Sequence, residues 1–210
     1  MDNQVVIQGP TTYIKDVLPT LCGGISYIWS TWKPVSTENR NMLDSYGVEL
    51  VESDVPAISG YGNVNMQSLS SLEGIKRCKS SRVLKIRSDI IVSSWTKLFE
   101  TLNCNKDRLS FLCYHNHNGG YPVDYINYGP TDLMFDFWNY QQTSASDLFA
   151  ERQLTNNFLK KHPLAVTDPT NEKCSFRYFL KDACKEGVEF RWLKCNISLS
   201  SYLKDPKYLT

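Results

Sequence analysis

Several signals of common protein classes are missing from this 210-residue sequence. It contains seven cysteines, but no two of them stand at the CxxC spacing, and their number is odd. This pattern argues against a zinc site and against a disulfide framework, and it is typical of reduced thiols in a cytosolic compartment. No apolar stretch approaches the length that spans a bilayer, and no N-terminal apolar run precedes a cleavage site. We therefore expect a cytoplasmic protein without a transmembrane segment.

The sequence also lacks an excess of charge of either sign. Its formal net charge is +1, so bulk charge does not indicate a nucleic-acid partner. Hydrophobic residues make up 41% of the chain, which is enough for a substantial core, and the length fits one domain. A strand is predicted almost at the first residue, which is the pattern expected of a catalytic domain within a longer polypeptide fused to further domains.

A third absence concerns the turn that follows the first predicted strand. The strand covers residues 4–7 and the turn covers residues 8–12. The sequence there is Gln8-Gly9-Pro10-Thr11-Thr12, which is not the GxGxxG fingerprint of a Rossmann dinucleotide site. A glycine in a first strand-to-helix turn nevertheless lets a ligand approach the backbone closely. We therefore expect a ligand at this turn, but not a dinucleotide held by a glycine-rich loop.

Apolar patterns of period 2 and period 3.6 alternate along the chain. They predict strands at residues 4–7, 25–29, 48–51, 83–89, 109–114, 124–128 and 188–193, and helices at about 11–18, 36–46, 66–79, 94–102, 131–138, 147–161 and 176–185. Strands that alternate with helices in this order predict an α/β domain with a mostly parallel sheet flanked by helices.

The central predicted strand, at residues 83–89, has the sequence VLKIRSD. Side chains alternate along a strand, so Lys85, Arg87 and Asp89 are expected on one face. At the carboxyl end of a parallel strand these groups face a ligand crevice, where the two cations could meet a diphosphate and Asp89 could hold a divalent cation. A structural ion pair at the strand end explains the same residues equally well.

Five short stretches in the same order resemble one family. The chain resembles the WavE-type lipopolysaccharide synthesis family of GT-A-like glycosyltransferases, and also the N-terminal glycosyltransferase domain of a chlorella-virus multidomain protein. The resemblance covers roughly residues 4–162 and rests on VIQGP at 6–10, STW at 30–32, NVNMQ at 63–67, LKIRSD at 84–89 and DYINYG at 124–129.

The resemblance implies a single GT-A-like domain over residues 1–210, with a nucleotide-binding half at 1–93 and an acceptor-side half at 94–210. It implies a nucleotide-diphosphate sugar, UDP-linked, and a glycan acceptor; the viral likeness implies UDP-L-rhamnose and a host cytoplasm. It further implies Mn²⁺ or Mg²⁺ at a DxD-type motif, matched here by Arg87-Ser88-Asp89, so Asp89 is the expected metal ligand. The residues expected to bind the donor are Gln8, Gly9, Pro10, Thr11, Ser53, Asp54, Asn65, Gln67, Lys85 and Arg87.

Transfer with inversion requires a base that removes the proton of the acceptor hydroxyl. GT-A enzymes usually place this carboxylate at the start of a helix beyond an acceptor loop, and Glu151 occupies that order here. An ordinary first-turn glutamate favoured by the helix dipole is an equally good interpretation of Glu151. Asp124 and Asp132 are the competing bases.

The sequence alone leaves two other classes of function open. A catalytically inactive module that binds a sugar nucleotide or a glycan would explain the arginine that replaces the first carboxylate of the motif. A nucleotidyltransferase shares the sheet topology, but it needs a basic glycine-rich loop after the first strand, and residues 8–12 contain neither lysine nor arginine.

Overall fold

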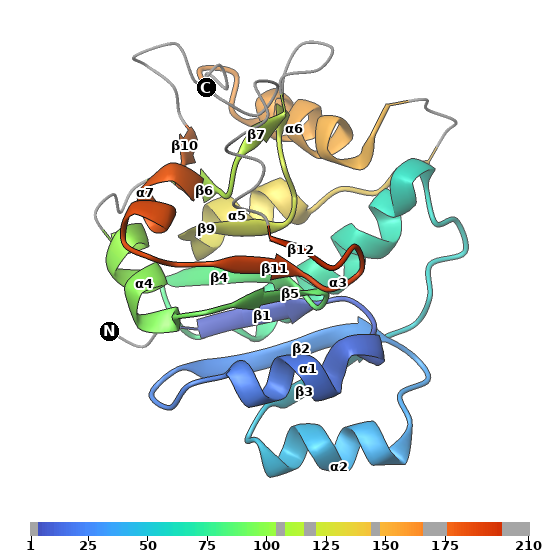
Figure 1. Cartoon of the computed structure of the whole chain (residues 1–210). Coiled ribbons are helices and arrows are strands. Elements are labelled where there is room, and N and C mark those ends of the chain that lie inside the picture. Colours follow the sequence, from blue (N-terminus) through green and yellow to red (C-terminus); the bar gives the residue numbers. More distant parts are fainter. Residues whose placement is uncertain (1–3, 104–107, 116–120, 144–147, 166–175, 199–210) are drawn as a thin grey trace.

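The computed structural model describes residues 4–103, 108–115, 121–143, 148–165 and 176–198. Within these residues a mostly parallel seven-stranded sheet is flanked by helices on both faces, as predicted (Figure 1). The strands of this sheet are β1 Gln4–Gln8, β2 Ser26–Trp32, β3 Glu49–Ser53, β4 Arg82–Arg87, β6 Leu109–Phe111, β9 Ile126–Pro130 and β10 Phe176–Tyr178. The α-helices are α1 Ile14–Val17, α2 Thr37–Ser45, α3 Val64–Arg77, α4 Trp95–Asn103, α5 Thr131–Trp138, α6 Ala150–Lys161 and α7 Leu180–Lys185, with 3-10 turns η1 Thr11–Tyr13, η2 Leu18–Thr20 and η3 Tyr61–Asn63.

The strand order is β10-β6-β9-β4-β1-β2-β3. Strands β3, β2, β1 and β4 run parallel to one another, whereas β9 is antiparallel to both β4 and β6. Gln8 at the end of β1 is paired with Arg87 at the end of β4 and with Ser30 of β2. The carboxyl ends of the parallel strands therefore meet at one edge of the sheet, which is where α/β folds place their ligands.

The two faces of the sheet build two hydrophobic cores. Val5 and Ile7 of β1 point into the core covered by α1, α2, α4 and α7, whereas Val6 points into the core covered by α3, α5 and α6. This alternation follows from the period of two along a strand. Because both faces are covered, the middle of β1 is a continuous apolar run from Val5 to Ile7, as expected for a parallel strand at the centre of a sheet.

A smaller sheet brings the end of the described chain back to the centre of the molecule. Its strands are β5 Ile90–Val92, β11 Phe190–Trp192 and β12 Ile197–Ser198, in the order β12-β11-β5, and a separate hairpin joins β7 Tyr114–His115 to β8 Tyr121–Pro122. In Figure 1 β11 lies alongside β5, with which it pairs antiparallel. Since β5 follows β4 almost directly, β11 lies next to the edge at which β4 ends.

Several predicted elements differ from the observed ones. The strands predicted at 109–114, 124–128 and 188–193 are observed as β6, β9 and β11, with ends shifted by up to three residues. The helix predicted at 176–185 is a strand, β10, followed by the short helix α7. Pairing with β6 and the packing of Phe176 against Phe111, with ring centroids 4.8 Å apart, override the helical pattern there. The strand predicted at 83–89 ends at Arg87, and the helix predicted at 11–18 is interrupted by 3-10 turns. The predicted start of α6 at position 147 lies outside the described residues.

The described helices include none that is long and apolar enough to cross a membrane.

Candidate functional site

A cavity of about 430 Å³ opens at the carboxyl ends of β1, β2 and β4. The turn after β1 and the N-terminal part of α3 form two of its walls, and the turn after β4 forms a third. Its lining residues are Gln8, Gly9, Pro10, Thr12, Tyr13, Trp32, Asn63, Met66, Gln67, Arg87, Ser88, Asp89 and Lys194. The cavity thus lies where the parallel topology places a ligand crevice.

Gly9 keeps the turn after β1 close to the turn after β4. Its φ is +132°, a backbone conformation that residues with a Cβ rarely adopt, and an added Cβ would lie 2.5 Å from Ser88 Oγ. The Ser88 amide donates to the Gln8 carbonyl over 2.8 Å, which fixes the two turns side by side. The floor of the cavity therefore depends on a glycine at position 9.

We expect Gly9→Ala to lower the free energy of unfolding by about 1–3 kcal/mol, the usual cost of a strained backbone conformation. It should also weaken binding of a ligand in the cavity, because the Ser88 side chain, which lines the cavity, must move away from the added methyl group. Gly23→Ala is the matched control, since an added Cβ at Gly23 meets nothing within 4 Å and its φ is not positive. Urea unfolding of both variants checks this, and equal stabilities would contradict the assigned role of Gly9.

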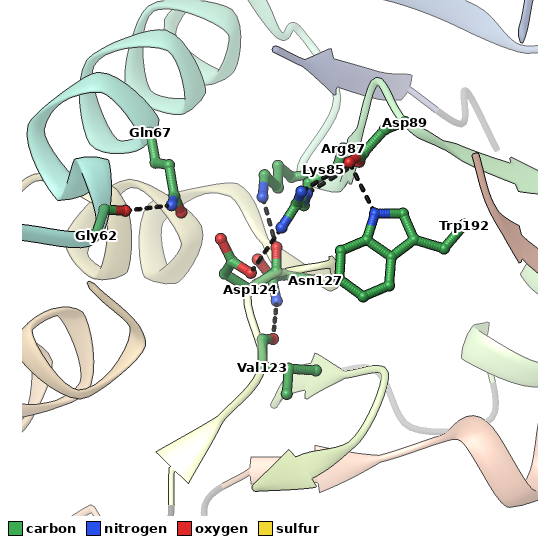
Figure 2. A network of polar contacts seen from close by, with 9 residues as sticks. All are labelled: Gly62, Gln67, Lys85, Arg87, Asp89, Val123, Asp124, Asn127 and Trp192. Carbon is green, nitrogen blue, oxygen red and sulfur yellow. Dashed lines mark hydrogen bonds and ion pairs between the residues drawn. The ribbon is translucent and has the colours of Figure 1, made fainter. Parts of the chain in front are cut away.

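Arg87 lines the cavity. Its guanidinium is held by the Asp89 carboxylate (Figure 2). Its Nε donates to Asp89 Oδ1 over 3.0 Å and its Nη2 donates to Asp89 Oδ2 over 2.7 Å, a bidentate pair. Trp192 Nε1 donates to the same Oδ2 over 2.8 Å, and the guanidinium lies near the rings of Tyr125 and Trp192. Burial alone would raise the pKa of Asp89, but the hydrogen bonds from Arg87 and Trp192 lower it below its usual range.

Lys85 and Asp124 are close to Arg87 in space and are more completely buried than it is. Lys85 is fully buried, with its ammonium 4.4 Å from the Trp138 ring centroid and donating to the Asp124 carbonyl. Burial lowers the pKa of Lys85 to about 8, although the nearby Asp124 opposes that shift. The Asp124 carboxylate is 1% exposed, and neither of its oxygens has a hydrogen-bond partner among the described residues. Its nearest cation is Arg87, whose Nη1 lies 3.9 Å from Oδ1.

Glu151 stands in the first turn of α6 and completes this charged cluster. An added Cβ at Gly62 would lie 3.3 Å from the Ala150 amide, so the start of α6 packs directly on η3. Burial and the charge of Asp124 raise the pKa of Glu151 from 4.5 to about 7, while Arg87 and Lys85 oppose the shift. A carboxyl group tuned to this range can accept a proton near neutral pH.

The geometry around Asp89 does not fit a divalent cation as it stands. Both of its oxygens already accept hydrogen bonds, and one donor is a guanidinium that would repel a second cation. Nor do the described residues include three or more His, Cys, Asp or Glu side chains grouped as metal ligands. An ion at Asp89 would have to displace Arg87 and Trp192.

The structure brings half of the predicted donor-binding residues to the cavity. Gln8, Gly9, Pro10, Gln67 and Arg87 line it, as does Asp89.

The other five predicted donor-binding residues are not among its lining residues. Thr11 accepts a hydrogen bond from Asn39, Asp54 pairs with Lys33, and Ser53 is buried at the end of β3. The Asn65 amide bonds the carbonyls of Ile58 and Gln142, each over 2.9 Å. Lys85 is fully buried near Arg87, as described above.

The two rival bases lie at opposite edges of the sheet. Asp124 precedes β9 and lies near Arg87, whereas Asp132 follows β9. Because β9 is antiparallel to β4, Pro130 is paired with Arg82, at the far end of β4 from Arg87. Asp132 is exposed and accepts a hydrogen bond from the Leu133 amide, so it is remote from the charged cluster.

Sequence reasoning missed several residues of this site. Trp32 carried a signal, since it lies three residues beyond a strand predicted at residues 25–29. Asn63, with φ of +59°, lies in a glycine-rich segment but was not assigned a role. Trp192 and Lys194 had no local signal, because only the pairing of β11 with β5 places them beside Asp89, 103 residues before Trp192.

No family model and no curated protein matches this sequence. Among solved structures, the chain is similar to the glycosyltransferase GlyE in Streptococcus pneumoniae TIGR4, with a TM-score of 0.51, 13% identity and coverage of 85% of this chain and 46% of GlyE. It also matches S. aureus TarS 1-349 in complex with UDP, with a TM-score of 0.49, 12% identity and coverage of 75% and 55%. The chain spans about half the length of these proteins. The likeness to GlyE shows that the described chain has a GT-A-like glycosyltransferase fold.

Proposed function

We propose that this chain is a glycosyltransferase that moves a sugar from a nucleotide-diphosphate donor, a UDP-sugar, to a glycan acceptor. The observation that carries the proposal is a cavity at the carboxyl ends of β1, β2 and β4 that is lined by Arg87. Glu151, in the first turn of α6, lies close enough to Arg87 and Asp124 for their charges to act on its pKa. Departure of a nucleoside diphosphate develops negative charge that a cation must stabilise, and the acceptor hydroxyl must lose a proton. The fold shared with GlyE is consistent with this chemistry.

In this proposal the turn of Gln8, Gly9 and Pro10 holds the nucleoside, and Arg87 faces the diphosphate. Asp89 and Trp192 fix the guanidinium, so that its direction does not depend on the ligand. Glu151 takes the proton of the acceptor hydroxyl, and its burial, together with the charge of Asp124, raises its pKa for that task. UDP-L-rhamnose as the donor stays a prediction. The expected Mn²⁺ or Mg²⁺ is untested, and the bonds of Asp89 to Arg87 and Trp192 do not fit Asp89 as its ligand.

The proposal is tested by adding a panel of nucleotide sugars and measuring both melting temperature and release of UDP. A donor at a hundred times its dissociation constant stabilises the fold by about 2.7 kcal/mol, which corresponds to a rise of roughly 5–10 °C. We expect such a shift with UDP-sugars, together with release of UDP when an acceptor glycan is present. A shift without turnover would identify an inactive binding module instead. No shift with any nucleotide sugar would overturn the proposal.

A further inference from the structure

The last described segment of the chain forms part of the wall of the cavity. The Leu193 amide donates to the Asp89 carbonyl over 2.8 Å, and Trp192 donates to the Asp89 carboxylate. These bonds fix the backbone immediately before Lys194, whose exposed side chain lines the cavity. Lys194 is thus placed by tertiary pairing, outside the stretch of sequence that carries the family resemblance.

The charges on the described lining of the cavity are mainly positive. Arg87 and Lys194 are its cations, and Asp89 is its carboxylate. Asp89 is fully committed to Arg87 and Trp192, and Lys194 has no ion-pair partner among the described residues. One lysine charge therefore faces the cavity without compensation, which favours an anionic ligand.

We infer that Arg87 and Lys194 together hold the diphosphate of the donor directly, without a bridging divalent cation. This inference rests on the proposed function and deepens it. A guanidinium and an ammonium supply the positive charge that a metal ion supplies elsewhere, and both donate charge-assisted hydrogen bonds to phosphate oxygens. Asp89 does not fit the role of a metal ligand, and the charge of Lys194 is uncompensated. Both observations point to the same arrangement.

The test measures affinity for UDP, uridine and inorganic pyrophosphate by calorimetry, in EDTA and in Mn²⁺. The parent protein should bind UDP in EDTA, and Mn²⁺ should change the affinity less than about threefold. Lys194→Ala should weaken UDP and pyrophosphate at least about tenfold, the worth of one hydrogen bond to a charged group, and leave uridine unchanged. Lys194→Arg should restore most of the loss. Lys185→Ala, an exposed lysine at the end of α7, is the matched control and should bind UDP like the parent.

Two results would overturn this inference and leave the proposed function standing. One is UDP binding that appears only with Mn²⁺ and is lost in Asp89→Ala. The other is equal UDP affinity in Lys194→Ala and the parent. Failure of UDP to bind in every condition would overturn both the inference and the proposed function.

Discussion

Glu151→Gln should lower the turnover rate by roughly 10²–10⁴, the usual contribution of a positioned general base. The substitution keeps the size of the side chain and its capacity for hydrogen bonds, but it removes the basic oxygen. The loss should appear in kcat as well as in kcat/KM, because the proton is transferred in the transition state. Affinity for UDP should barely change, since the base contacts the acceptor and not the nucleotide.

The pH dependence of the parent provides an independent check on Glu151. Because burial and Asp124 raise its pKa to about 7, the group is ionised and basic above that pH and protonated below it. We therefore expect kcat/KM to fall as the pH drops through about 7. This dependence on pH should be absent in Glu151→Gln.

The rival bases supply the controls for Glu151. Asp132→Asn should leave the turnover rate unchanged, because Asp132 lies at the opposite end of β9 from the charged cluster. If Asp132→Asn or Asp124→Asn abolished turnover while Glu151→Gln stayed within a few-fold of the parent, Glu151 would not be the base.

Lys85→Met should destabilise the fold by about 3–5 kcal/mol, the usual cost of leaving a buried charge without its compensation. Asp124 is 1% exposed and its carboxylate accepts no hydrogen bond from the described residues, so the charges of Lys85 and Arg87 compensate it. Without Lys85 it would also lose the donor to its carbonyl. Urea unfolding at neutral pH measures the loss.

The double variant Lys85→Met/Asp124→Leu separates lost charge from lost packing. It should recover part of the stability, because it removes the uncompensated carboxylate. Lys76→Met serves as the control, since Lys76 is an exposed residue of α3 paired with Glu73, and it should change stability by less than about 1 kcal/mol. If Lys85→Met and Lys76→Met lowered the free energy of unfolding equally, the buried charge cluster would contribute little to stability.

The sequence was most informative where the chemistry is local. Val83 to Arg87 form a strand because a β-branched and apolar pattern is buried on both faces, and their charged end marks the edge of the site. Gly9 was predictable as a close-approach position because it directly follows β1. The fold class followed from the alternation of strands and helices.

The rest of the site depends on contacts that no local pattern encodes. The pairing of β11 with β5 brings Lys194 to the cavity. The antiparallel direction of β9 places Asp124, and not Asp132, near the end of β4 that carries Arg87. The spacing of Arg87 and Asp89 predicted either a shared face toward a ligand or an ion pair at the strand end, and the structure has the ion pair. That bidentate pair is what changes the expectation for a metal ion at Asp89.

A crystal structure of this protein with UDP tests the central claim most directly. We predict that UDP occupies the cavity at the carboxyl ends of β1 and β4, with uridine against the turn of Gln8 to Pro10. Its diphosphate should lie within hydrogen-bond distance of the Arg87 guanidinium. UDP bound at another surface, or in this cavity with its diphosphate turned away from Arg87, would contradict the account.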